Sequence, residues 1–433
     1  MFVRLCVVFT LFMITGCSDS STENETPGGS AAPPKDNADA VKLIEEAGGA
    51  LLRNANGNVV EVDLSSPTAE FKQALSQLTE LPALARLKLY GSTFTDADLL
   101  HVAKLPGLRN LDLSRTDVTD DGIATLKPLE KLNTINLSQV PAITDDALKY
   151  LAEMPGIRDI RLVKTGITDA GIAHLSNMEA LVRLDLRGTK VTDGCFALLK
   201  DLPNLRNLRC QGSGATMGPE GIPNLKGVTS LVVLGLDNAQ VTDEALAELS
   251  TLVNLEELYL YNAQITDDGL AHLKNFPKLR ILKLRETGLS GRGFEHLAEL
   301  KNLQELELAE SSFGFGGEGP EALGKMTSLV KLNLWNTGVN DESFIHLAGL
   351  KNLKELNLDN IGLSDAAMDT VAGFSKLESL NIANNFITDQ GLAKLHGLSN
   401  LKYLNVQYSS GGITEEGVNA LQAAIPGLKV DYY

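Results

Sequence analysis

The chain has 433 residues, of which 43% are hydrophobic and 5% aromatic, so it can bury a large core built mainly from aliphatic side chains. Its formal net charge of -17 argues against a nucleic-acid binder, because such proteins need lysine and arginine to displace the counterions of phosphates. We therefore expect no nucleic acid among its partners.

The N-terminal sequence MFVRLCVVFTLFMITGC predicts a targeting segment over residues 1–17. One cation, Arg4, precedes an apolar run that is too short to span a bilayer as a mature helix. The ending Ile-Thr-Gly-Cys resembles the bacterial lipobox, which implies that Cys17 becomes the lipidated N-terminus of a membrane-anchored lipoprotein. An ordinary secretory signal, cut elsewhere, is the alternative. The serine after Cys17 favours, by analogy with bacterial sorting, an outer-membrane or cell-surface location outside the cytoplasm.

Two short regions lie between this segment and the repeats. Residues 18–38 are rich in serine, proline, glycine and acids and have no apolar period, so we expect a disordered tether. Residues 39–58 indicate a short helix and a strand, which we expect to cap the open edge of the first repeat. At the other end, residues 428–433 predict a strand that caps the last repeat.

One pattern, L-x-x-L-x-L, fills residues 59–427, with a step of 24 residues in most copies and 25 to 27 in the others. Copies include LARLKL at 84, LEELYL at 255 and LKELNL at 353. Within LYLYN, Leu258 and Leu260 face one side of a strand, whereas Tyr259 and Tyr261 face the other. The sequence that follows, ITDDGLAHLKNF, changes to steps of three residues and predicts a helix.

These copies resemble leucine-rich repeats of the subclass that continues with T-x-(I/V)-T-D-x-G-L, and similar arrays occur in bacterial leucine-rich-repeat lipoproteins. The resemblance implies an α/β solenoid of horseshoe shape, with a parallel β-sheet on the concave face and helices on the convex face. Since no coil can bury its own apolar face, stability should be a sum over contacts between neighbouring coils.

The stretch TDDGLAH, which begins at Thr266, could be a metal site or a helix start. We interpret Thr266 as an N-cap that accepts from a backbone N–H of the first turn, and Asp267 as an acid that suits the positive helix end. The Thr-Asp pair recurs along the array, but the second acid gives way to alanine, glycine or glutamine in other coils. A metal ligand would not vary so freely, so we expect no metal and no cofactor.

Two further features leave alternatives open. Cys195 and Cys210 stand at repeat positions that favour buried free thiols, although an exported protein could oxidise them if they touch. Glycine-rich stretches replace the Thr-Asp motif near residues 211, 311 and 408, without the GK[ST] of a phosphate loop. They indicate either duplication of a four-coil block or a row of contact loops that exposes Phe313 and Phe315.

The repeat also predicts which side chains line the concave face. Its cations and aromatic residues are candidates for a partner-binding site, because tryptophan, tyrosine and arginine dominate binding hot spots. These residues are Arg161, Arg183, Arg187, Arg209, Tyr259, Tyr261, Lys283, Arg285 and Trp335. The alternative is a solvated sheet face on which the arginines pair with nearby acids.

We therefore expect a lipid-anchored module outside the cytoplasm that binds a protein partner through its concave face. The alternative is a structural component of the envelope or cell surface that binds itself or polysaccharide. We do not expect an enzyme, because the sequence lacks HExxH, a GxSxG elbow, a Cys-His pairing and paired inward carboxylates.

Overall fold

The computed structural model describes residues 34–432 except 70, 213–216 and 312–317. Residues Asp36–Tyr433 form one compact unit. The predicted targeting segment with Cys17, most of the predicted tether, and Phe313 and Phe315 lie outside the described residues.

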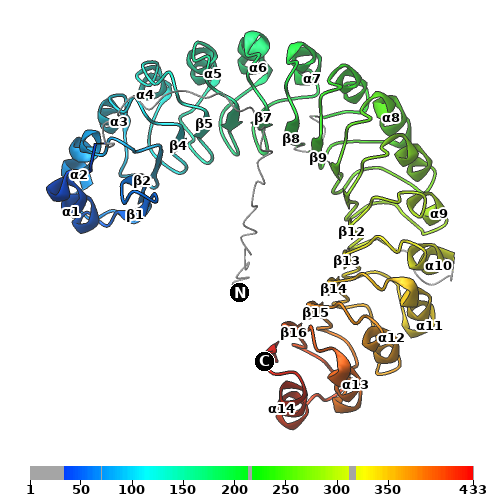
Figure 1. Cartoon of the computed structure of the whole chain (residues 1–433). Helices are drawn as coiled ribbons and strands as arrows, with labels where there is room; N and C mark the ends of the chain where they lie inside the picture. Colours follow the sequence, from blue (N-terminus) through cyan, green and yellow to red (C-terminus); the bar gives the residue numbers. More distant parts are fainter. Residues whose placement is uncertain (1–33, 70, 213–216, 312–317, 433) are drawn as a thin grey trace, which may run out of the picture. The chain divides into compact units, whose positions relative to one another are not determined.

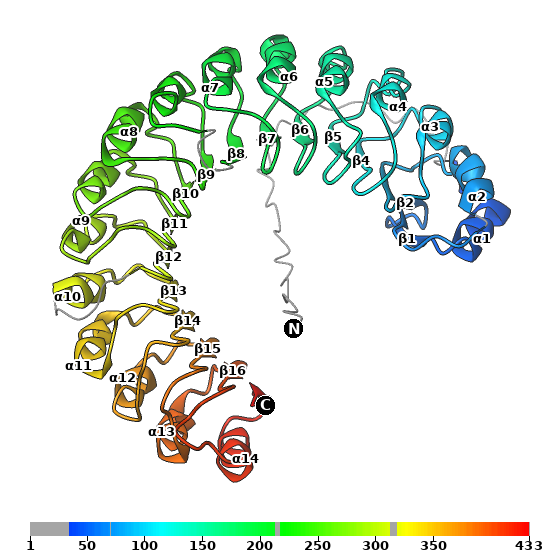
Figure 2. The same cartoon turned by 180° about the vertical axis from the view of Figure 1, so that it is seen from behind.

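Within this unit the coils are stacked in an arc, with the strands along the inner side and the helices along the outer side (Figure 1). Figure 2 shows the same arrangement from behind. The described residues include one sheet of 17 strands. β1 is antiparallel to β2, and each later strand is parallel to the strand before it. The predicted solenoid, with a parallel concave sheet and convex helices, is confirmed.

The strands of the sheet are short and regularly spaced along the chain. They are β1 (Ala50–Arg53), β2 (Val59–Leu64), β3 (Arg86–Leu89), β4 (Asn110–Asp112), β5 (Thr134–Asn136), β6 (Asp159–Arg161), β7 (Arg183–Asp185), β8 (Asn207–Gln211), β9 (Val233–Asp237), β10 (Glu257–Tyr259), β11 (Ile281–Lys283), β12 (Glu305–Glu307), β13 (Lys331–Asn333), β14 (Glu355–Asn357), β15 (Ser379–Asn381), β16 (Tyr403–Asn405) and β17 (Lys429–Asp431).

Short α-helices and 3-10 helices form the convex side. The α-helices are α1 (Ala38–Glu46), α2 (Phe71–Gln77), α3 (Asp96–Val102), α4 (Asp120–Ala124), α5 (Asp145–Ala152), α6 (Asp169–Ala173), α7 (Cys195–Leu198), α8 (Asp243–Glu248), α9 (Phe294–Leu297), α10 (Glu318–Gly324), α11 (Asp341–Phe344), α12 (Met368–Ala372), α13 (Asp389–Lys394) and α14 (Glu415–Ala424). The 3-10 helices are η1 (Leu78–Glu80), η2 (His174–Asn177), η3 (Leu199–Asp201), η5 (Ile222–Gly227), η6 (Leu249–Thr251), η7 (Gly269–Asn275), η8 (Ile345–Gly349) and η9 (Leu395–Gly397).

Repeated leucines fill the space between strands and helices. In the coil that contains β10, Leu255, Leu258 and Leu260 are fully buried, and Leu270 and Leu273 of η7 are fully buried as well. The same pattern in every coil produces one continuous hydrophobic core. Full burial of each such side chain contributes about 1.5–3 kcal/mol, so the array is stabilised by many equal increments.

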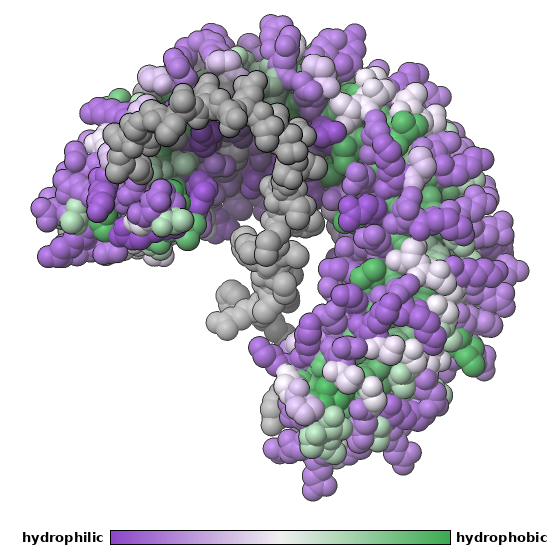
Figure 3. Space-filling model, viewed as in Figure 1, coloured by the Kyte–Doolittle hydropathy of each residue, from purple (hydrophilic) through white to green (hydrophobic). Residues whose placement is uncertain are grey.

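The outer surface differs from this core in polarity. In Figure 3 polar residues cover most of the visible surface of the coils, and apolar residues form small separate spots. Among the described residues, no helix has both the length and the apolar character needed to cross a membrane.

The Thr-Asp motif joins neighbouring coils, which corrects our interpretation of Thr266 and Asp267. The backbone N and Oγ1 of Thr266 donate to Asp243 of the preceding coil, at 2.9 and 2.5 Å. The N-cap position of η7 is occupied by Asp268 rather than Thr266. Asp267 in turn accepts from the backbone N–H groups of Ser290, Gly291 and Gly293 in the following coil.

The physical reason is the close stacking of the coils, which brings each carboxylate within reach of the next coil's turn. A Cβ at Gly269 would lie 2.1 Å from Oδ1 of Asp243, so the glycine of the motif leaves room for that carboxylate. The same bond between coils occurs at Asp96 with Thr119 and at Asp365 with Thr388. The motif is therefore structural, as predicted, but it links coils instead of only capping helices.

The array ends in α1 and β1 on the N-terminal side and in β17 on the C-terminal side. Helix α1 begins after Asn37, whose side chain accepts from Asp39 N and Ala40 N, and it buries Ile44 against the core. β1 then pairs with β2 on the edge of the sheet. At the other end β17 pairs with β16, and Tyr432 Oη donates to the carbonyl oxygen of Ile413 at 3.0 Å.

Candidate functional site on the concave face

The sheet register places all of the predicted site residues except Arg183 in two rows along the concave face, and Arg183 lies two residues before the middle row. We call the position between the second and third repeat leucines the middle row, which contains Arg209, Gly235 and Tyr259. The position two residues later is the trailing row, which contains Arg285 and, two coils further on, Trp335. Neighbouring strands lie about 4.8 Å apart, so a long side chain can cross one strand and contact the next.

A first stack joins Arg209 of β8 to Tyr259 of β10. The guanidinium carbon of Arg209 lies 4.2 Å from the centre of the Tyr259 ring. Gly235 of β9 stands between them in register, so no side chain separates the two. Tyr259 Oη donates to Glu257 at 2.7 Å, and the Glu257 carboxylate also lies 3.7 Å from Arg209. Burial raises the pKa of Tyr259, so its phenol stays protonated as a donor at neutral pH.

A second arginine–aromatic stack lies in the trailing row, between Arg285 and Trp335. The guanidinium carbon of Arg285 lies 4.9 Å from the centre of the Trp335 ring. The intervening coil contributes only the small side chain of Ala309 at this position, and Ala309 is fully buried. Backbone bonds of this coil fix the spacing, since Glu286 N donates to Ala309 O and Glu310 N donates to Trp335 O. Arg285 also pairs with Glu310 and, at 3.3 Å, with Glu286.

Lys283 and Tyr261 lie between the two stacks and share an acid. Lys283 forms ion pairs with Glu305 and, at 3.2 Å, with Glu307, and its side chain is only 13% exposed. Tyr261 Oη donates to Glu307 at 3.2 Å. Burial and the charge of Glu307 raise the pKa of Tyr261. The lysine is therefore held by acids and is not an open cationic contact.

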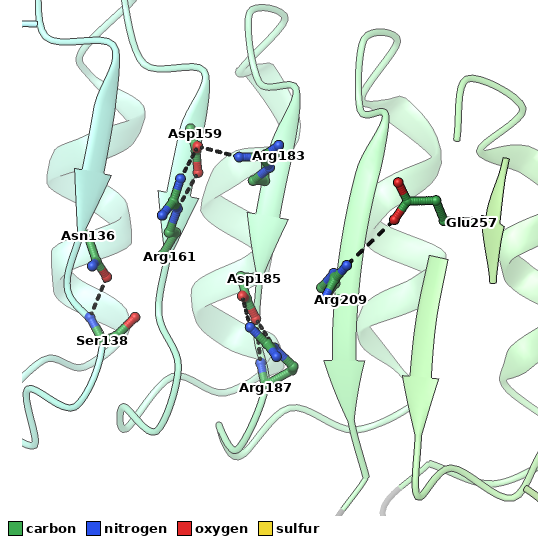
Figure 4. A network of polar contacts seen from close by, with 9 residues as sticks. All are labelled: Asn136, Ser138, Asp159, Arg161, Arg183, Asp185, Arg187, Arg209 and Glu257. Atoms are coloured by element: carbon green, nitrogen blue, oxygen red, sulfur yellow. Dashed lines mark hydrogen bonds and ion pairs between the residues drawn. The ribbon is translucent and has the colours of Figure 1, made fainter. Parts of the chain in front are cut away.

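Arg161 of β6, Arg183 of β7 and Arg187, which follows β7, are also paired (Figure 4). Arg161 donates to Asp159 at 3.3 and 3.1 Å, and Arg183 donates to the same carboxylate at 3.1 Å. Arg187 donates to Asp185 at 2.9 and 2.7 Å. Burial lowers the pKa of Arg161, but its hydrogen bonds and the charge of Asp159 outweigh this effect and raise the pKa. The hydrogen bond to Asp185 raises the pKa of Arg187.

Each of the six predicted cations thus has a carboxylate within 4 Å. The alternative interpretation, arginines paired with nearby acids, describes these contacts well. Neighbouring carboxylates largely balance the positive charge of Arg161, Arg187 and Lys283. What remains accessible is aromatic and guanidinium surface held in fixed orientation, chiefly in the two stacks.

Sequence reasoning missed two other arginines on this side of the molecule. Arg158 and Arg206 occupy the first variable position of their repeats, directly before the strand, and both are exposed. Neither has an ion-pair partner among the residues that the structure describes. Their position in the repeat could have indicated this. The backbone N–H of the residue that follows each of them donates to the neighbouring coil, so both arginines stand at the edge of the sheet.

Three other features are a depression in the concave face, the residues that could bind a metal, and the two described cysteines. A depression of about 260 Å³ is lined by Lys283, Glu305, Glu307 and Lys331 on the concave face, and it is polar. Within the described ranges, no group of three or more histidine, cysteine, aspartate or glutamate side chains could hold a metal ion. Cys195 and Cys210 are free thiols and fully buried.

Comparison with known proteins identifies the repeat. Family models described as leucine-rich repeats match residues 351–410 and 106–127. A leucine-rich repeat protein from Leptospira interrogans has a TM-score of 0.51 and 17% identity, over 82% of this chain and 98% of that chain. The TLR13–ssRNA13 complex has a TM-score of 0.50 and 19% identity, over 82% of this chain and 57% of that chain.

An internalin from Listeria monocytogenes is 18% identical with a TM-score of 0.46, over 91% of this chain and 94% of that chain. No curated protein matches the sequence. At 17% identity the likeness to the Leptospira protein shows the fold alone. The two family matches, together with the coils that the structure repeats along the sheet, identify leucine-rich repeats in this chain.

Proposed function

We propose that this protein is a lipid-anchored binding module that holds a protein partner against its concave face, outside the cytoplasm. The observation that carries the proposal is the pair of stacks, Arg209 with Tyr259 and Arg285 with Trp335, which are partly exposed on that face. Aromatic and arginine side chains of this kind supply most of the binding energy in protein interfaces.

The stacks are suited to binding because they are already ordered. Glu257 fixes Arg209 and Tyr259, and Glu310 fixes Arg285 beside Trp335. A partner that docks on them does not need to immobilise these side chains, and each side chain that must be ordered on binding costs about 0.5–1.5 kcal/mol. Pre-ordering therefore supports affinity without adding contacts.

The balanced charges on the same face favour a partner with a mixed polar and apolar surface. Lys283 already has two acids, and Arg187 donates twice to Asp185, so the charge of both is balanced and gives no preference for a highly charged partner. A protein surface can supply apolar groups to the rings and hydrogen bonds to the carboxylates. These features, and the leucine-rich repeat fold, support a binding role over a catalytic one.

Anchoring rests on the sequence ending in Cys17. The lipobox resemblance supports attachment of lipid to that thiol and a location at the outer membrane or cell surface. Cys17→Ala should release the protein from membranes or block its maturation, because each buried methylene of an acyl chain contributes about 0.8 kcal/mol. Ser18→Ala is the matched control. Unchanged membrane fractionation and N-terminal mass in Cys17→Ala would contradict the anchor.

The binding face is tested by placing a photoreactive amino acid at Trp335 and, separately, at the convex residue His272 in cells that make the protein. The proposal predicts crosslinks to a defined protein from position 335 and none to that protein from position 272. Equal crosslinking from both positions would contradict it. Crosslinks only to a second copy of the chain, or to polysaccharide, would favour the structural envelope role.

A further inference from the structure

Arg158 and Arg206 border a depression at the start of strands β6 to β9. We call this feature the leading groove, and it is lined by Arg158, Val182, Arg183, Arg206, Asn207 and Val232 among others. Its volume is about 370 Å³, and a second depression of about 400 Å³ shares Arg158, Val182, Arg206 and Val232 with it. The two therefore form one continuous feature along the edge of the concave sheet.

The sheet fixes the positions of these residues. Val182 N and Arg183 N both donate to the carbonyl oxygen of Arg158, at 2.8 and 2.9 Å. Val232 N donates to the carbonyl oxygen of Arg206 at 2.8 Å. Arginine and valine thus alternate on successive coils, and the two arginines stand about 10 Å apart, twice the strand spacing.

The leading groove differs from the rest of the candidate site in charge. Among the described residues Arg158 and Arg206 have no carboxylate within ion-pair distance, whereas the cations of the two stacks do. Two acids line the two depressions, and both are already paired. Asp159 accepts from Arg161 and Arg183, and Glu256 lies 3.4 Å from Arg280. In a chain with a net charge of -17, this groove is a local excess of positive charge.

Its floor is apolar and contains one unsatisfied acceptor. Val182 and Val232 are partly buried, and Val233 is 8% exposed. Oδ1 of Asn207 is buried and has no hydrogen-bond partner among the described residues. A buried acceptor without a partner destabilises the fold by about 1–3 kcal/mol.

We infer that the leading groove binds an extended acidic segment of a protein partner, with carboxylates on Arg158 and Arg206 and aliphatic side chains on the valines between them. The inference rests on the proposed protein-binding function, and it adds that one segment of the partner is acidic and carries aliphatic side chains. A nucleic acid fits less well, because none of the described residues that line the groove is aromatic and could stack on a base.

The test uses the mature chain and a short fluorescent peptide that alternates glutamate and valine, with both ends capped. Its binding is measured by anisotropy, and we expect saturable binding that weakens as salt is raised. Arg158→Gln with Arg206→Gln should reduce affinity at least tenfold. Lys354→Gln with Lys402→Gln is the matched control, because these lysines occupy the same repeat position but share Glu378 as an acid partner.

Three results would overturn the inference: no saturable binding of the peptide, equal loss in both double variants, or equal binding of a glutamine–valine peptide. A single-stranded RNA that binds more tightly and displaces the peptide would also overturn it in favour of a phosphate ligand. None of these results affects the crosslinking from Trp335, so failure of this inference is distinguishable from failure of the proposed function.

Discussion

Replacement of Asp267 by alanine should destabilise the array at one junction between coils. Its carboxylate accepts from Ser290 N at 3.0 Å, Ser290 Oγ at 2.5 Å, Gly291 N at 3.1 Å and Gly293 N at 3.0 Å. A buried hydrogen bond to a charged acceptor contributes about 1.5–3 kcal/mol. Since this site is only partly buried, water replaces part of the loss, and we expect a total of about 2–3 kcal/mol.

The neighbouring acid provides the matched control. Asp268 is exposed, and although it stands at the N-cap position of η7 its side chain makes no capping hydrogen bond there. Asp268→Ala removes the same charge one residue away, so it should change stability by less than about 0.5 kcal/mol. Urea unfolding followed by circular dichroism measures both variants. Hydrogen exchange should also show faster opening at Ser290, Gly291 and Gly293 in Asp267→Ala only. Equal midpoints for the two variants would refute our assignment of Asp267 as a link between coils.

The same site predicts a dependence on pH. Burial raises the pKa of Asp267, but its hydrogen bonds outweigh burial, so the folded pKa lies below the ordinary value of 3.8. A lowered folded pKa stabilises the protein above about pH 3.8, and this contribution is lost as pH falls through the folded pKa. The difference in stability between wild type and Asp267→Ala should therefore narrow below pH 3.8. A difference that stays constant would contradict the ionic bond.

Two further predictions concern packing. Gly349→Ala should destabilise the protein by about 1–3 kcal/mol, because its Cβ would lie 2.4 Å from the carbonyl oxygen of Gly324. Gly397 occupies the same repeat position, but a Cβ there would have no atom within 4 Å, so Gly397→Ala should not change stability. Equal melting temperatures for the two variants would refute this prediction. A hydrogen bond with Cys210 and burial raise the pKa of Cys195, so a thiol reagent should label both cysteines only after unfolding. Peptide mapping that finds either labelled in the folded protein would contradict this.

The spacing of leucines was sufficient to predict the fold. Leu258 and Leu260 are buried while Tyr259 and Tyr261 remain partly exposed, because alternation along a strand decides which side chains face the core. The same rule placed Trp335 on the concave face. These features depend only on positions within one repeat, and every coil provides another copy of the same signal.

Contacts between coils were harder to predict, because they join residues about one repeat apart. The bond from Thr266 to Asp243 requires the exact stacking of two coils, which a single repeat does not encode. The stack of Arg209 on Tyr259 depends on Gly235 in the coil between them, and only the register reveals that gap. Arg158 was missed because its position lies one residue before the strand, ahead of every repeat position that we assigned to the concave face.

The central claim, that the concave face binds a partner through its aromatic stacks, is tested most directly by titrating the crosslinked partner against Trp335→Ala. We expect affinity to fall by about 2 kcal/mol or more, because hot-spot residues lose this much on truncation. The melting temperature should not fall, because Trp335 lies outside the leucine core. His272→Ala, on the convex side, should bind like wild type. Equal affinity of wild type, Trp335→Ala and His272→Ala for the partner would contradict the claim.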